Sequence, residues 1–150
     1  MKKEAHSYKY DFSRWPLVVS CQYGDPTRPE VEAFYSTFDG SLARGDLYFS
    51  IALIDHSDHS STVGKDVAAD WIKRNREAIG RQSLGAALVI RSTLLRGLVK
   101  AFMMFNRVPG GATQIVSTME EALDLAQQAF QQAGVVLAPA PRDWPRIGQS

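Results

Sequence analysis

Hydrophobic and polar positions follow two different periods along the chain, and the changes between them predict the order of strands and helices. Alternating or continuous apolar runs predict five strands, at residues 7–12, 17–23, 46–55, 84–90 and 112–116. Apolar positions three and four residues apart predict four helices, at residues 27–45, 63–82, 93–106 and 117–133. Capping-box spacing is present at the start of two of them, in the pair Thr27 and Glu30 and in the pair Ser117 and Glu120. The order β-β-α-β-α-β-α-β-α predicts an α/β fold with a mixed, mostly parallel five-stranded sheet. The opening hairpin supplies an antiparallel strand at one edge.

The most apolar part of the chain is residues 84–106, where a short continuous apolar run leads directly into a helix. The run has the composition of a strand that is covered on both faces of a sheet. Ser92 stands at the N-cap position, where its hydroxyl can accept from the free amides of the first turn. One broad apolar arc of the helix is predicted to contain Leu94, Leu95, Leu98, Val99, Phe102 and Phe105.

The opposite side of this helix is a narrow basic stripe. It contains Arg96, Lys100 and Arg107, and Met103 and Met104 lie on its two borders. The apolar arc is wider than a surface helix needs to pack on a sheet, so a neighbouring helix, the chain's own tail, a ligand or another protein should cover the remainder. Flexible thioethers beside positive charge suit an acidic protein surface or an anionic amphiphile. These five residues are the predicted partner or ligand surface.

Composition is that of an ordinary soluble single domain. The 150 residues, 45% apolar and 22% charged, can form one core without disulfides or metal. The only cysteine, Cys21, lies in an apolar run, which favours a buried thiol in a reducing compartment. The sequence shows no membrane-spanning run and no signal peptide. We expect a cytoplasmic domain over residues 1–134 and a proline-rich C-terminal tail over residues 135–150. Two alternatives are open for this tail: it is extended throughout, or residues 135–137 or Trp144 pack on the domain.

Charge is balanced overall but unevenly distributed. The net charge of +1 gives no general attraction to nucleic acid. Between Glu77 and Glu120 there is no acidic residue. The basic residues in that interval are Arg81, Arg91, Arg96, Lys100 and Arg107. This distribution predicts a local basic patch around the helix at residues 93–106.

Three stretches give the chain a family resemblance. They are SRWPLVVS, the apolar strand before IDHSDHSST, and the pair RSTLLRGLVKAF and VSTMEEALDLAQQAF. Together with the element order, over residues 7–133, they resemble the STAS family of anti-sigma-factor antagonists and sulfate-transporter tails. The resemblance implies a non-enzymatic switch or scaffold that binds a protein partner, a nucleotide or an apolar molecule.

The antagonists of that family carry a phosphorylatable serine in a D-[ST]-S-G motif after the third strand. This chain reads DHSDHSSTVG there, so Asp55 and a serine-rich loop are present but the tight motif is absent. No single serine is therefore assigned. The predicted regulatory loop contains Asp55, Ser57, Ser60, Ser61 and Thr62. A phosphate at this position would meet the free amides at the start of a helix.

Catalysis and metal binding find little support in the sequence. His56 and His59 stand near two aspartates, but the spacing is not that of a helical zinc motif and no second ligand cluster exists. No nucleophile elbow or glycine-rich phosphate loop occurs. We expect no cofactor and no enzyme activity, although an enzyme using either histidine is a third hypothesis.

The first hypothesis is a regulatory or scaffolding module that acts by binding another protein or a second copy of itself. The alternative is a carrier or sensor of an apolar or anionic amphiphilic ligand.

Overall fold

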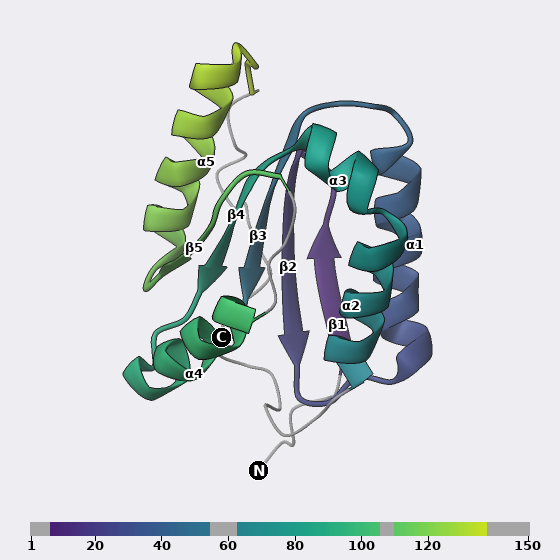
Figure 1. Cartoon of the computed structure of the whole chain (residues 1–150), viewed down its shortest axis with the longest axis vertical. Helices are drawn as coiled ribbons and strands as arrows, with labels where there is room; N and C mark the ends of the chain where they lie inside the picture. The colour runs from purple at the N-terminus through teal and green to yellow at the C-terminus, as the bar shows by residue number, and fades with distance from the viewer. Residues whose placement is uncertain (1–6, 55–62, 106–109, 138–150) are drawn as a thin grey trace.

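The computed structural model describes residues 7–54, 63–105 and 110–137 (Figure 1). The strands are β1 (Ser7–Asp11), β2 (Leu17–Tyr23), β3 (Tyr48–Leu53), β4 (Ser83–Val89) and β5 (Thr113–Val116). The helices are α1 (Arg28–Leu42), α2 (Val63–Arg74), α3 (Arg76–Gln82), α4 (Thr93–Phe105) and α5 (Met119–Ala133). The predicted α/β fold with a five-stranded mixed sheet is confirmed.

The strands lie side by side in the order in which they occur along the chain, β1-β2-β3-β4-β5. β1 is antiparallel to β2, and every other neighbouring pair is parallel. Right-handed crossovers between successive parallel neighbours place their helices on the same face of a sheet. α5 follows the last strand and is free to cover the opposite face, as Figure 1 shows for α5 against α1 and α2.

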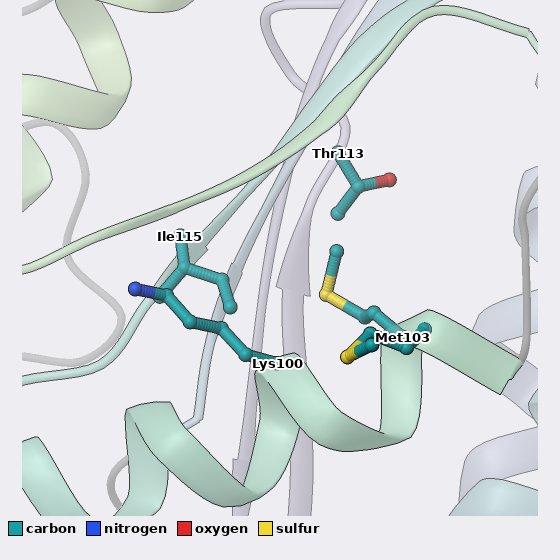
Figure 2. Close-up of a pocket in the computed structure, with 5 residues that line it drawn as sticks. Lys100, Met103, Thr113 and Ile115 are labelled. Carbon is teal, nitrogen blue, oxygen red and sulfur yellow. The ribbon is translucent and has the colours of Figure 1, made fainter.

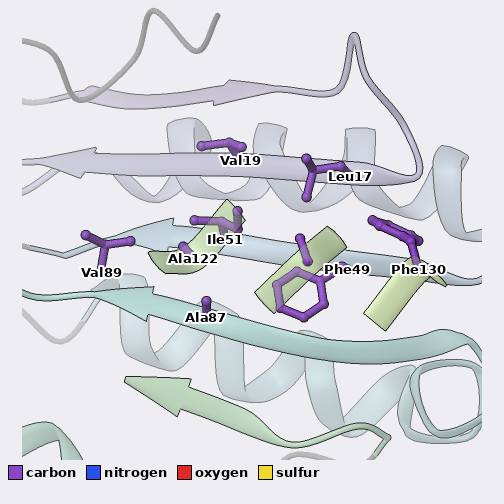
Figure 3. Packing of buried hydrophobic residues seen from close by; sticks show 9 residues of the cluster. Leu17, Val19, Phe49, Ile51, Ala87, Val89, Ala122 and Phe130 are labelled. Atoms are coloured by element: carbon purple, nitrogen blue, oxygen red, sulfur yellow. The ribbon is translucent and has the colours of Figure 1, made fainter. Parts of the chain in front are cut away.

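One half of the core lies between the sheet and α5 (Figure 3). Its buried members are Leu17, Val19, Phe49, Ile51, Ala87, Val89, Ala122, Ala126 and Phe130. The strand residues in this set alternate along β2, β3 and β4, as expected when one face of each strand points toward the same helix. α5 ends at Gly134, whose φ of 73° is the left-handed conformation that closes many helices.

The other half of the core lies between the sheet and α1–α3 and is strongly aromatic. Its buried members are Val18, Phe34, Phe38, Leu42, Tyr48, Trp71 and Ile79. The ring centroids of Phe38 and Trp71 lie 4.8 Å apart, so α2 packs directly on α1. Cys21 is 1% exposed, which confirms its predicted burial within β2.

The single helix predicted at residues 63–82 is wrong, because the structure has two helices that meet at Asn75. The Asn75 backbone leaves helical geometry, with φ −112° and ψ 17°. Its side-chain Nδ2 donates to the Trp71 carbonyl oxygen at 2.9 Å, and its backbone N donates to the same oxygen at 3.0 Å. The Trp71 carbonyl oxygen thus accepts from both donors of Asn75 at the residue where α2 ends and α3 begins.

Helix starts agree with the sequence at α1 and differ by one residue at α5. Thr27 and Glu30 form the predicted capping box of α1. The second capping box was predicted at Ser117 and Glu120, but the N-cap is Thr118, whose side chain accepts from Glu121 N. The Glu121 carboxylate also accepts from Ser117 Oγ at 2.7 Å, so both hydroxyl residues before the helix are used.

After α5 the chain continues to pack on the domain for at least three residues. Val135 and Leu137 lie against the core on the α5 side of the sheet, whereas Val136 is 93% exposed. The rest of the predicted tail, residues 138–150, lies outside the described residues.

Candidate partner-binding surface

α4 begins as the sequence predicted, at a serine cap. Ser92 Oγ accepts from Leu95 N at 3.2 Å, and the Ser92 carbonyl oxygen accepts from Arg96 N at 2.9 Å. The helix turns one side inward, along a stripe in which Leu95 is buried and Val99 and Met103 are half-buried. These three residues are four positions apart, so the inward side of α4 is narrow.

The outward side of α4 is apolar. Leu94 is 77% exposed, Leu98 is 61% exposed and Met104 is 76% exposed. Gly97 and Ala101, which lie between them on the helix surface, are also exposed. Leu94 and Leu98 thus belong to the part of the predicted apolar arc that the sheet does not cover, and no other described part of the chain buries them. Among the described residues, α4 presents Leu94, Leu98 and Met104 to solvent, and we call this group the outer face of α4.

Arg96 lies on a different side of α4 from the one that the sequence predicted. It was predicted to point outward in the basic stripe, but it is half-buried. Its Nη1 donates to the carbonyl oxygens of Ile90 at 3.0 Å and Arg91 at 3.3 Å, and Nη2 donates to Thr93 Oγ1 at 3.3 Å. The guanidinium therefore connects the end of β4 to the start of α4 by hydrogen bonds. Of the predicted basic stripe, Lys100 is the exposed cation in the described part of the helix.

A hollow separates α4 from the last strand (Figure 2). It has a volume of about 480 Å³ and is lined by Lys100, Met103, Met104, Thr113 and Ile115. Thr113 and Ile115 pair with Ala86 and Leu88 of β4, which alternate with the residues under α5. The hollow therefore opens on the sheet face opposite α5, and Figure 2 shows the two β5 side chains pointing toward α4.

The structure thus brings together three of the predicted surface residues, Lys100, Met103 and Met104, around this hollow. Sequence reasoning missed Thr113 and Ile115, although the alternation of ATQIV places both on one face of a strand. Nothing in that alternation says that the face meets the methionines of α4 rather than a helix of the core.

Several predicted residues fall outside the described parts of the chain. Arg107 and the whole regulatory loop, with Asp55, Ser57, Ser60, Ser61 and Thr62, belong to this group, and so do the side chains of Phe102 and Phe105. Their roles remain predictions.

Within residues 7–54, 63–105 and 110–137, no three or more His, Cys, Asp or Glu side chains gather to hold a metal ion. None of the helices in those ranges is both long and apolar enough to cross a membrane. His56 and His59 lie outside the described residues.

Comparison with known proteins identifies the fold. No family model and no curated protein matches the sequence. A solved structure does match: an uncharacterized protein of the DUF3478 family with a SpoIIAA-like fold, from Shewanella loihica PV-4. The two share 16% sequence identity, and the match covers 84% of this chain and 98% of that chain with a TM-score of 0.58. The chain therefore has a SpoIIAA-like, STAS-like fold, as the resemblance of its sequence implied.

Proposed function

We propose that this protein is a non-catalytic regulatory or scaffolding module that binds a protein partner through the outer face of α4. The observation that carries the proposal is the exposure of Leu94, Leu98 and Met104 on one side of a single helix. Contiguous apolar surface of this kind, next to a cation such as Lys100, is typical of interaction sites rather than of the remaining protein surface. The SpoIIAA-like fold is compatible with such a role.

The described groups whose pKa values are clearly shifted lie away from the hollow. Burial raises the pKa values of Tyr8, Tyr35 and Tyr48, and hydrogen bonds from Ser117 and Thr118 lower the pKa of Glu121. These tyrosines lie in or against the aromatic core, and Glu121 caps a helix. None of these four groups lines the hollow. Each pKa shift follows from burial in the core or from hydrogen bonds at a helix cap.

The test compares an outer-face variant with a matched control. Leu94→Glu and Leu98→Glu, combined in one chain, should abolish recovery of specific partners from native cells, measured by quantitative mass spectrometry after crosslinking. Val136 is 93% exposed and lies outside α4, so Val136→Glu should leave the recovered partners unchanged. An identical set of partners with both variants would contradict the proposal.

A carrier or sensor of an anionic amphiphile is the second candidate, and the hollow is the observation in its favour. Met103, Met104 and Ile115 supply apolar lining and Lys100 supplies a positive charge. Dodecanoate should then raise the melting temperature of the wild-type protein, because a ligand that binds only the folded state stabilises it. The rise should disappear in Lys100→Glu. A pure protein-binding module would show no rise in either protein.

Regulation by phosphate in the loop at residues 55–62 is part of the proposal. Replacing Ser57, Ser60, Ser61 and Thr62 together by Asp adds negative charge before α2 and should change partner affinity. Replacement by Ala is the control, and unchanged affinity in the Asp variant would argue against a switch.

A further inference from the structure

β5 is the last strand of the sheet, and its backbone is paired on one side only among the described residues. The carbonyl oxygens of Ala112 and Val116 accept from Ala86 N at 3.1 Å and Ile90 N at 2.8 Å. Backbone groups of alternate residues point the same way in a strand, so the N–H and C=O groups of Thr113 and Ile115 point to the outer edge. This edge is a template for one more strand.

The side chains of the same two residues line the hollow beneath α4. Figure 2 shows Thr113 and Ile115 facing Met103 and Lys100 across it. A strand added at the outer edge of β5 would place every second side chain on the same sheet face, next to the hollow. Edge backbone and hollow therefore form one composite site: the backbone can supply hydrogen bonds, and the hollow can select the side chains.

The positive charge at this site favours an acidic segment over a second copy of the chain or the chain's own C-terminal residues. Lys100 lines the hollow, and no acidic residue occurs between Glu77 and Glu120, an interval that contains both α4 and β5. A second copy of the chain paired edge to edge would bring like charges together. The chain's own residues 138–150 include Pro139, Pro141 and Pro145, and proline cannot donate to a strand ladder.

We infer that the outer edge of β5 and the hollow beneath α4 bind an extended, acidic segment of a partner protein by strand addition. Apolar side chains of the segment enter the hollow against Met103 and Ile115, and a carboxylate meets Lys100. The inference rests on the proposed function, since it assumes a protein partner. It differs from that proposal in using the backbone edge of β5. Met104 belongs to both surfaces, whereas Leu94 and Leu98 belong to the outer face of α4 alone.

A phage-displayed library of random twelve-residue peptides, selected on the full chain, supplies the probe. Selected sequences should combine β-branched or aromatic residues with Asp or Glu and should lack proline. The synthetic consensus peptide should slow hydrogen exchange at the Thr113 and Ile115 amides. Its affinity should fall at least tenfold in Lys100→Glu. A library that yields no binder, or yields basic or proline-rich peptides, would overturn the inference.

Two N-methylated versions of the consensus peptide test the backbone directly without altering the protein. Methylation of the alternate residues whose N–H groups face β5 should weaken binding at least tenfold, and methylation of the other alternate set should leave it within about twofold. Equal effects of both sets would show that side chains alone are bound and would overturn strand addition. Thr113 and Ile115 amides that are protected without peptide, in a protein that sediments as a dimer, would make a second copy the occupant and overturn the partner assignment.

The outer-face variant separates this inference from the proposed function. If Leu94→Glu with Leu98→Glu loses the native partner while the peptide experiments fail, the proposed function stands and the strand-addition site does not. If the peptide experiments succeed while the native partner is retained by the outer-face variant, the partner uses the β5 edge and the outer face of α4 has another role.

Discussion

Arg96 Nη1 lies 3.0 Å from the carbonyl oxygen of Ile90, and this hydrogen bond joins the first turn of α4 to the end of the strand before it. The bond uses a cation that the sequence pattern assigns to the solvent side. Arg96 is directed toward β4, and the inward side of the helix contains Leu95, Val99 and Met103. The same helix presents Leu94, Leu98 and Met104 to solvent.

Arg96→Met should therefore destabilise the protein more than Lys100→Met does. Removal of the guanidinium leaves the carbonyl oxygens of Ile90 and Arg91 without this donor, at a cost of about 1–2 kcal/mol in the free energy of unfolding. Lys100 is exposed, so its replacement should change that free energy by less than about 0.5 kcal/mol. Urea unfolding of both variants measures the difference. Equal stabilities would show that Arg96 only solvates the helix.

Met103 and Met104 are neighbours in sequence but should respond differently to a negative charge. Met104 is 76% exposed, so Met104→Glu should change the free energy of unfolding by less than about 0.5 kcal/mol. Met103 is half-buried at the hollow, and Met103→Glu should lower that free energy by about 1 kcal/mol or more because it desolvates a carboxylate. Thermal unfolding at neutral pH compares them. A neutral effect of Met103→Glu would mean that the hollow is wet enough to hydrate a charge.

Trp71 and Asp39 should be energetically coupled. Trp71 Nε1 donates to Asp39 Oδ1 at 2.7 Å, and this bond ties α2 to α1 at the edge of the aromatic core. Asp39→Ala leaves the nearly buried indole N–H without its acceptor and should cost about 1–3 kcal/mol. A double-mutant cycle with Trp71→Phe should give a coupling energy of about 1 kcal/mol. Additive effects of the two substitutions would assign the contribution of Trp71 to ring packing alone.

Stability should fall steeply in alkaline solution because of the buried tyrosines. Burial raises the pKa of Tyr8 from 10.0 to about 12, and burial likewise raises the pKa of Tyr48 to about 12. Since the folded pKa lies above the unfolded one, the stabilisation is fully present below pH 10 and is lost as pH rises from about 10 to about 12. Tyr48→Phe should flatten the fall in melting temperature across that window. An unchanged slope would mean that Tyr48 ionises as easily in the folded state as in the unfolded chain.

Residues 135–137 should contribute to stability although the sequence pattern places them in a tail. Val135 and Leu137 pack against the core on the α5 side, so a chain ending at Gly134 should remain cooperatively folded but be about 1–3 kcal/mol less stable than a chain ending at Leu137. The comparison isolates these three residues, and equal unfolding midpoints would show that their packing contributes nothing.

Much of the fold follows from local patterns. Alternation in β1, the apolar run of β4 and the capping box at Thr27 each depend on residues close together in sequence, and these elements formed where expected. The break at Asn75 could not be predicted, because the apolar period of residues 63–82 continues through it. At this break the Asn75 side chain donates to the carbonyl oxygen of Trp71, and the spacing of hydrophobic residues does not predict such a hydrogen bond.

The candidate site was harder to predict than the fold. A helical pattern shows how wide an apolar face is, and α4 was correctly expected to be too apolar for the sheet alone. The pattern does not show which side of the helix faces the sheet. In the structure Leu95 is buried, and Arg96 is bonded to the end of β4. Met103 lines the same hollow as Thr113 and Ile115 because of the orientation of α4 and the β4–β5 register. Neither can be predicted from the local pattern of hydrophobic residues.

The sheet order has a consequence for how the protein is made. Each strand from β2 onward pairs with the strand that precedes it in the chain, so every new strand leaving the ribosome meets a partner that is already synthesised. Such sequential pairing keeps the closed loops short and lets the nascent chain extend its sheet from the N-terminus onward. Among the described residues, β5 is the last strand in this order, and its outer edge has no neighbouring strand. A segment of another molecule that bound there would add the next strand to the sheet.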